Sequence, residues 1–232
     1  MSIAAVVDWI FRPQCAACGA PAVTLCDACR ASLVELGAAC PRCAEPAGDD
    51  DAPGSCRRCR AWPLPIDRVV APWRFGGQLG SAIRRLKFAN RAHIARDLAP
   101  LWAPVLAAAV AEHDAIVVAV PLHWRRRCRR GYDHAWLLAR HACTLAGVAP
   151  PVTVLRRIRH VPAQSTLPAA ARAENIRGAF AATRALAGRA VVLVDDVMTT
   201  GATLGAAASA LRDAGAGAIT GLVVARATSA RE

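Results

Sequence analysis

Short apolar runs alternate with amphipathic stretches along the chain after residue 64. Runs that are apolar almost throughout predict strands over 69–75, 115–122, 152–158, 191–196 and 218–226. Helical spacing of apolar positions predicts helices over 77–88 and about 92–111, a third that follows the arginine-rich stretch and ends at Ala146, and a fourth from Thr203 to about Ala214. Fully apolar strands that alternate with helices indicate a parallel sheet with helices on both faces. The expected fold class is therefore α/β.

The first 63 residues lack this alternation, and "AWPLP" (61–65) marks where it begins. We expect two parts, a small cysteine-rich module over 1–63 and a larger domain over 64–232. The module opens with an apolar stretch interrupted by Asp8 and without basic residues at its start, so we interpret it as a short amphipathic helix and not a signal peptide. The longest apolar stretch, Leu98–Ala111, contains two prolines and is too short to span a bilayer. No membrane insertion and a cytoplasmic location are expected.

Eight of the ten cysteines form four Cys-x-x-Cys pairs: Cys15 and Cys18, Cys26 and Cys29, Cys40 and Cys43, Cys56 and Cys59. Two thiolates at this spacing grip one metal ion, and two such knuckles complete a tetrahedral site. The sequence therefore predicts two structural Zn²⁺ sites. The simplest pairing is sequential, the first two pairs in one site and the last two in the other, and a crossed pairing is the alternative. Disulfides are disfavoured because nothing indicates an oxidising compartment.

The net charge of +12 is distributed unevenly. Residues 1–65 carry a balance of −1, and the remaining residues carry +13. An excess of this size indicates polyanionic ligands such as phosphates, nucleotides or nucleic acid. Part of it reflects an arginine-rich composition, since Lys87 is the only lysine.

The segment "VVLVDDVMTTGAT" (191–203) combines a buried strand, two acids and a turn rich in threonine and glycine. The turn offers successive backbone N–H groups, three hydroxyls and the positive end of the following helix, which together suit a phosphate. Asp195 and Asp196 can accept hydrogen bonds from two neighbouring hydroxyls. A 5-phosphorylated ribose satisfies both halves. A P-loop is excluded because no Gly-Lys-Ser/Thr is present, and a receiver-type phosphoacceptor would need more chain after Asp196.

The same segment closely resembles the 5-phosphoribosyl-1-pyrophosphate (PRPP) motif of type I phosphoribosyltransferases. Two further segments, "PLHWRRRCRRGYDH" (121–134) and "QSTLPAAARAENIRGAF" (164–180), are similar to motifs of one branch, the ComF (ComFC/GntX-like) proteins, which also have an N-terminal zinc module. The resemblance covers the chain from Cys15 to Arg226. It implies a type I phosphoribosyltransferase-like parallel sheet preceded by a double zinc ribbon.

The resemblance also implies roles for particular residues. The PRPP site would comprise Asp195, Asp196, Val197, Met198, Thr199, Thr200, Gly201, Ala202 and Thr203, with the acids on the ribose hydroxyls and the turn on the 5-phosphate. The pyrophosphate loop would comprise Pro121, Leu122, His123, Arg130 and Gly131. A flexible loop from about Arg159 to Arg172, including Gln164 and Arg172, would close over PRPP. Mg²⁺ would be bound mainly by PRPP oxygens.

Some positions remain open at this stage. The family has Asn-Gln where this chain has Asp133 and His134, and we expect His134 at the surface rather than at a ligand. Lys87 is a candidate phosphate contact. Trp124 and Tyr132 flank the arginine-rich stretch, either as platforms for stacking bases or as ordinary packing residues, the reading we favour.

Two functions are compatible with these patterns. The first is a Mg²⁺-dependent phosphoribosyltransferase that uses PRPP and an acceptor which the residues do not identify. The second is a PRPP sensor or a single-stranded-DNA-binding protein on the same fold. The ComF resemblance implies a link to DNA uptake and to its machinery in either case.

Overall fold

The computed structural model of the chain describes residues 14–21, 24–47, 54, 56–89, 91–159 and 175–228. The expected N-terminal helix and the flexible-loop residues Gln164 and Arg172 lie outside these ranges. No single helix in the described part is long and apolar enough to cross a membrane, although the bent pair Ile94–Leu101 and Ala103–Ala111 together passes on length and composition.

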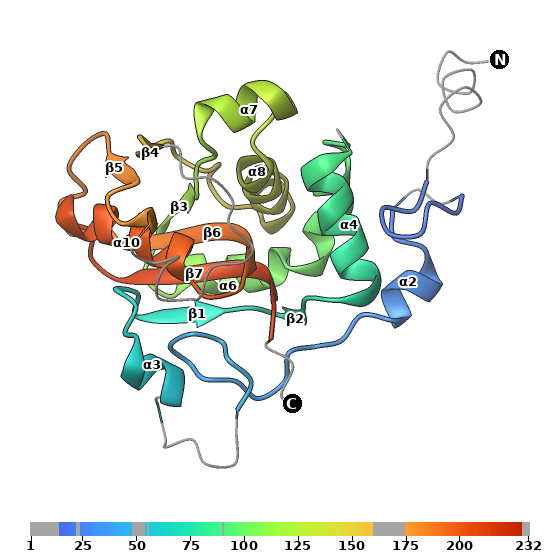
Figure 1. Ribbon diagram of the computed structural model, residues 1–232, viewed down its shortest axis with the longest axis horizontal. Coiled ribbons are helices and arrows are strands. Elements are labelled where there is room, and N and C mark those ends of the chain that lie inside the picture. The colour runs from blue at the N-terminus through green and yellow to red at the C-terminus, as the bar shows by residue number, and fades with distance from the viewer. Residues whose placement is uncertain are drawn as a thin grey trace.

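A parallel sheet forms the centre of the molecule (Figure 1). Its strands run in the order β1 (Arg68–Val70), β7 (Ile219–Arg226), β6 (Val191–Met198) and β3 (Ile116–Ala119), and β2 (Trp73–Arg74) pairs with the far end of β7. Every residue of β7 is buried, as expected of a central strand covered on both faces. The α/β fold class predicted from the alternating pattern is confirmed.

Helices cover one face of this sheet. Buried side chains of α4 (Gly77–Phe88), α5 (Ile94–Leu98), α6 (Ala103–Ala111) and α8 (His134–Ala146) pack with inward residues of β6 and β7 in one apolar core. The helix expected over 92–111 is broken, since Pro100 and Pro104 lie in a 3₁₀ turn (Ala99–Leu101) and at the start of α6. The expected strand 69–75 is similarly divided at Pro72, between β1 and β2.

The other face is covered by α10 (Ala202–Asp213) and by a two-stranded antiparallel sheet of β4 (Leu155–Arg157) and β5 (Phe180–Ala182). The prediction that 152–158 continues the parallel sheet was therefore wrong. The segment does contact β3, because the Val152 amide donates to the Val117 carbonyl, but its strand then pairs with β5. Periodicity identified a strand and could not identify its partner.

The arginine-rich stretch after β3, expected as a loop, forms the short helix α7 (Trp124–Arg130). The His123 side chain caps its first turn, accepting from the Arg125 amide, and Gly131 ends it in the left-handed conformation.

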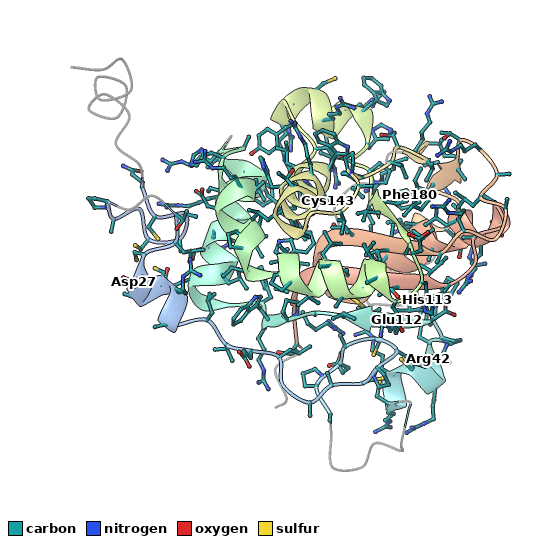
Figure 2. All side chains as sticks on the ribbon, turned by 180° about the vertical axis from the view of Figure 1, so that it is seen from behind. Asp27, Arg42, Glu112, His113, Cys143 and Phe180 are labelled. Atoms are coloured by element: carbon teal, nitrogen blue, oxygen red, sulfur yellow. The ribbon has the colours of Figure 1, made fainter. Side chains whose placement is uncertain are left out.

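The two cysteine clusters pack against opposite faces of the sheet. Cys15 and Cys29 belong to the core beneath α4, whereas all four cysteines of the second cluster belong to the core beneath α10. In the view from behind, Asp27 beside the first cluster and Arg42 within the second lie on opposite sides of the molecule (Figure 2). The segment between them follows the sheet edge, where the Arg74 amide donates to Val34 and the Leu36 amide to Pro72. Two short helices, α2 (Asp27–Ala31) and α3 (Arg57–Ala61), begin directly after Cys26 and Cys56.

Candidate functional site

Both cysteine clusters have the geometry of a four-thiolate metal site. The four Sγ atoms of each cluster all lie within 4.8 Å of one another. The first cluster comprises Cys15, Cys18, Cys26 and Cys29, and the second comprises Cys40, Cys43, Cys56 and Cys59. The Sγ–Sγ distances are 3.8 Å between Cys18 and Cys26 and 3.5 Å between Cys43 and Cys56. Sulfurs bound to one Zn²⁺ at ~2.3 Å are separated by about 3.8 Å at a tetrahedron's edge, whereas a disulfide needs about 2.05 Å.

These distances decide the pairing in favour of the sequential assignment. The donors present, four thiols in each closed cluster, fit two structural Zn²⁺ sites. Within the second cluster burial raises the pKa of the Cys59 thiol to about 11 in the absence of metal. Because zinc binds the thiolate, metal binding there releases protons and supplies folding free energy.

The acid–threonine segment lies where β6 ends. The strand continues through both acids to Met198, two residues further than predicted, and α10 begins at Ala202 after the left-handed Gly201. A pocket opens at this point above the N-terminus of the twelve-residue helix. Its lining comprises Asp195, Val197, Met198, Thr199, Thr200, Gly201, Ala202, Thr203, Leu204 and Val223.

Gly201 is required by this turn. Its φ is +76°, and a Cβ at this position would lie 2.5 Å from Met198 Cε and 3.0 Å from Leu64 Cδ1. Other residues disfavour such a φ, and a methyl group here would displace the ends of the Met198 and Leu64 side chains. The Thr200 hydroxyl accepts from the Ala202 amide at 3.4 Å, which holds the turn at the helix entrance.

The two acids point to opposite faces of the sheet. Alternation along β6 places Asp195 on the α10 face, where it lines the pocket, and sends the 2% exposed Asp196 toward α4 and α8. Asp196 Oδ2 is ion-paired with Lys87 Nζ at 2.8 Å and with His134 Nε2 at 2.9 Å. Both acids therefore lie at the site, although they meet different surroundings.

Their surroundings shift their pKa values apart. Burial raises the pKa of Asp195 to about 7, and the neighbouring Asp196 charge adds to this shift. Burial also opposes ionisation of Asp196, but Lys87 and His134 outweigh it and hold the pKa of that carboxyl well below its usual range. Such separation of two adjacent carboxyls is common at functional sites.

His134 is buried, so the expectation of a surface position was wrong. It starts α8 behind Asp133, whose carboxylate accepts from the Trp136 amide, and the helix carries the ring toward β6. His134 Nδ1 lies 2.7 Å from Arg130 Nη1. Since a guanidinium can only donate, Nδ1 is the acceptor, and the ring proton is on Nε2 facing Asp196. The sequence did not indicate this role because His134, at the start of α8, and Asp196, on β6, are far apart in the chain and meet only when the helix packs against the strand.

The predicted pyrophosphate loop lies beside this site. Parallel pairing of β3 with β6 brings Pro121, Leu122 and His123 to the same sheet edge as the two acids. The Leu122 amide donates to Asp133 Oδ2 at 2.7 Å, so Asp133 fixes this loop as well as the start of α8. The structure thus gives Asp133 and His134 structural tasks. Of the two candidate stacking residues, Tyr132 donates to the Leu86 carbonyl and is half-buried, while Trp124 is 60% exposed.

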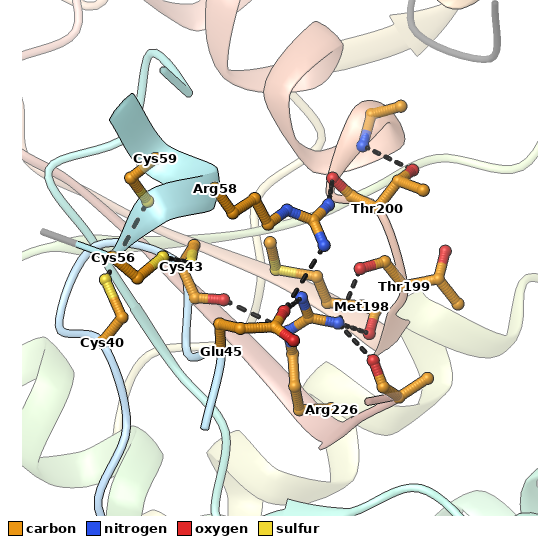
Figure 3. Close-up of polar contacts among 12 residues, drawn as sticks. Cys40, Cys43, Glu45, Cys56, Arg58, Cys59, Met198, Thr199, Thr200 and Arg226 are labelled. Atoms are coloured by element: carbon orange, nitrogen blue, oxygen red, sulfur yellow. Dashed lines mark hydrogen bonds and ion pairs between the residues drawn. The ribbon is translucent and has the colours of Figure 1, made fainter. Parts of the chain in front are cut away.

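Three residues at the site were not anticipated. Arg226, Arg58 and Glu45 connect the second cysteine cluster to the threonine turn (Figure 3). The sequence did carry one signal, since Arg226 ends a central strand whose other residues are apolar except for Thr220, and a charge buried there needs partners.

Comparisons with known proteins agree with this architecture. Residues 6–60 match the family described as double zinc ribbon domain, and residues 129–232 match the phosphoribosyl transferase domain. The chain is 33% identical to DNA utilization protein YhgH of Salmonella typhi and 32% identical to that of Escherichia coli K12, each over 84% of this chain and 87% of the relative. It is 31% identical to Competence protein F of Haemophilus influenzae over 69% of this chain and 73% of the relative. The chain belongs to the ComF family, with a double zinc ribbon joined to a phosphoribosyltransferase domain.

Proposed function

We propose that the chain binds PRPP together with Mg²⁺ and acts in the uptake or use of DNA, as the names of its relatives suggest. The observation that carries this proposal is the pocket from Asp195 to Thr203 at the carboxyl end of β6. It combines a carboxylate for ribose hydroxyls with a threonine turn and helix N-terminus for the 5-phosphate. A cytoplasmic location is part of the proposal.

The division of the two acids refines the proposed ribose contact. Asp195 faces the pocket, while the Asp196 oxygen is held by Lys87 and His134. Both acids were expected on the ribose diol; we propose that Asp195 makes the nearer contact. Lys87, a candidate phosphate contact from the sequence, is proposed to reach the ligand from its ion pair, since its side chain is 26% exposed.

The donors present also fit Mg²⁺ that arrives with PRPP. His134, Asp195 and Asp196 each place one possible ligand atom within 4.8 Å of the others. Asp196 is already paired with Lys87, so Asp195 is the one of the two acids that faces the pocket. One carboxylate is too few for a Mg²⁺ site made by protein ligands alone. The ion would neutralise charge on the pyrophosphate. Arg130, beside His134, would hold the same group from the pyrophosphate loop with Leu122 and His123.

Binding of PRPP can be tested with an isosteric substitution in the turn. Thr203→Val removes a pocket hydroxyl, and we expect PRPP affinity to fall by tenfold or more, since a hydrogen bond to a charged group contributes about 1.5–3 kcal/mol. Thr144→Val, on the exposed surface of α8, is the matched control. Calorimetric titration with Mg²⁺ and with EDTA measures both. Equal affinity of the two variants for PRPP would contradict the site assignment.

Whether the protein is an enzyme depends on the acceptor. Pyrophosphate release from PRPP, measured against a panel of bases, amines and single-stranded DNA, separates the two readings. Release that depends on one acceptor makes the protein a phosphoribosyltransferase. Tight binding of PRPP without release makes it a sensor.

A second candidate function, binding of single-stranded DNA, is favoured by helix α7. Arg125, Arg127 and Arg129 are exposed there, and the Arg125 guanidinium lies 5.3 Å from the ring centroid of the exposed Trp124. Cations combined with an aromatic face suit a flexible polyanion with stackable bases. Replacing these three arginines with alanine should weaken binding and reduce its salt dependence. If the salt dependence of binding, measured by fluorescence anisotropy, is unchanged in this variant, helix α7 is not the DNA-binding surface.

A further inference from the structure

Arg226 is a fully buried arginine at the end of the central strand β7. Its relative exposure is 0%, and its guanidinium donates to backbone carbonyls and to one carboxylate. Nη1 donates to the carbonyls of Met198 at 2.9 Å and Thr199 at 2.6 Å, and Nε donates to the Cys43 carbonyl at 3.2 Å. Nη2 is ion-paired with Glu45. One side chain therefore joins the second cysteine cluster to the turn that follows β6.

Arg58 extends the same connection by one residue. It lies between Cys56 and Cys59 on α3, and its Nη2 donates to the Thr200 carbonyl. Its Nη1 lies 3.4 Å from the Glu45 carboxylate that also holds Arg226. Figure 3 shows both guanidinium groups between the cysteines and the turn. Three successive carbonyls, those of Met198, Thr199 and Thr200, are thus bound by two arginines.

The direction of these carbonyls fixes the direction of the amides. In a trans peptide the C=O and N–H of one unit point in opposite directions, and the chain has no cis peptide among the described residues. The carbonyls of Met198, Thr199 and Thr200 point to the arginines. The amides of Thr199, Thr200 and Gly201 therefore point away from the arginines, to the opposite side of the turn. Successive amides that share a direction form an anion-binding concavity.

Packing supports the connection at the same place. Leu64, which follows the second cluster, lies against the start of α10: a Cβ built on Gly201 or on Gly205 would be 3.0 Å from its methyl groups. Leu64, the cysteines of the second cluster and Leu204 belong to one apolar core. The first cluster lies in the other core, beneath α4.

From these contacts we propose that the second zinc knuckle positions the anion-binding turn. Arg58 and Arg226, anchored by Glu45 and the Cys43 carbonyl, hold the carbonyls of the turn so that its amides face the 5-phosphate. Arg58, Arg226 and Glu45 are positioning residues in this role and do not touch the ligand. The first cluster has no part in it. The inference rests on the proposed function, because it assigns the anion of that site to the turn.

The first test replaces Arg58, whose side chain is 29% exposed and can be removed without a buried cavity. Arg58→Ala should weaken ribose 5-phosphate binding by about tenfold, and Arg58→Lys should restore most of it because an ammonium can still donate to the Thr200 carbonyl. Arg57→Ala, an exposed neighbour on the same helix, removes an equal charge and should change affinity by less than about twofold. The unliganded melting temperature and zinc content of each variant report on folding.

The second test compares the two zinc sites within one chain. Cys56→Ser and Cys18→Ser should each lower zinc content from two to one per chain. Cys56→Ser should weaken ribose 5-phosphate binding by about tenfold or more, whereas Cys18→Ser should leave it within about twofold.

The outcomes separate this inference from the proposed function. Wild-type protein that binds neither PRPP nor ribose 5-phosphate overturns the proposed function and the inference with it. If the wild type binds ribose 5-phosphate and Arg58→Ala binds it with the same affinity, the inference alone is overturned. The same holds if Arg58→Lys binds as weakly as Arg58→Ala. A loss of affinity of equal size on removing either zinc site also overturns the inference alone.

Discussion

The ion pair between Lys87 and Asp196 allows a quantitative prediction for stability. Asp196 is almost fully buried, and two groups compensate its charge, Lys87 at 2.8 Å and His134 at 2.9 Å. Lys87→Met removes the lysine cation while preserving most of the side-chain volume. The carboxylate is then left in the core with His134 as its one remaining partner among these contacts.

The size of the effect follows from the burial of the two partners. Removing one partner of a buried ion pair costs about 3–5 kcal/mol. His134 remains, and the Lys87 side chain is 26% exposed, so we expect a loss below that range, about 2–3 kcal/mol at pH 8. For a chain of this length each kcal/mol lowers the melting temperature by about 2–4 °C, which gives a decrease of about 4–12 °C.

The effect should depend on pH in a defined direction. The folded-state pKa of Asp196 is lowered, so its stabilising contribution is fully present above the unfolded pKa of about 3.9 and is lost as pH falls through the folded value. Without Lys87 burial prevails, and the folded pKa rises. The variant then avoids part of its penalty by protonating Asp196. Its melting temperature should therefore approach that of the wild type as pH falls from 8 to 6.

A double-mutant cycle provides the decisive measurement. Lys87→Met combined with Asp196→Asn removes both charges and should recover most of the stability lost by Lys87→Met alone. Arg84→Met, exposed on the same helix, is the control and should stay within about 0.5 kcal/mol of wild type. A loss for Lys87→Met that persists in the double variant, or that matches Arg84→Met, would refute the reasoning.

Three further predictions concern the turn, its acid and the zinc sites. Gly201→Ala should lower the melting temperature more than Gly188→Ala, since both have φ near +77° but only Gly201 would place its Cβ against a neighbour; equal shifts would exclude the clash. Asp195→Asn should gain stability relative to wild type as pH rises from 5 to 8, because the raised pKa of Asp195 means that stability is lost between the unfolded pKa of about 3.9 and the folded value of about 7; thermal unfolding at both pH values tests this, and an equal difference at pH 5 and pH 8 would contradict it. Metal analysis of Cys128→Ser should still find two zinc ions per chain, because this exposed thiol belongs to neither cluster.

Local chemistry explains why much of the fold could be read from the sequence. The apolar runs at 191–196 and 218–226 are central strands because a parallel sheet buries both of their faces. Gly201 between a strand and a helix predicted a turn, and the helix after it was placed within one residue. The four cysteine pairs predicted two metal sites because each knuckle is a local structure. In these cases the relevant contacts lie within a few residues of each other.

Long-range contacts account for the errors. Residues 152–158 form a strand as predicted, but hydrogen bonds across a gap of about twenty residues decided that its partner is β5 and not the main sheet. His134 has the same sequence neighbours whether it is exposed or buried, and only the packing of α8 against β6 brings it to Asp196. A polar side chain acquires its role from partners that the linear pattern does not contain.

The sequence by itself determined the donor set of this protein: eight cysteines in knuckles, and two acids followed by a threonine turn. Residue types and short spacings carry that chemistry. Only the tertiary structure decided that Asp195 faces the pocket while Asp196 is held by Lys87 and His134, and that Arg58 and Arg226 reach the turn from the second cluster. Arg58 and Thr200 are 142 residues apart in the chain. Their contact exists because the sheet and its core bring the cluster and the end of β6 together, and burial then makes each partner necessary to the other.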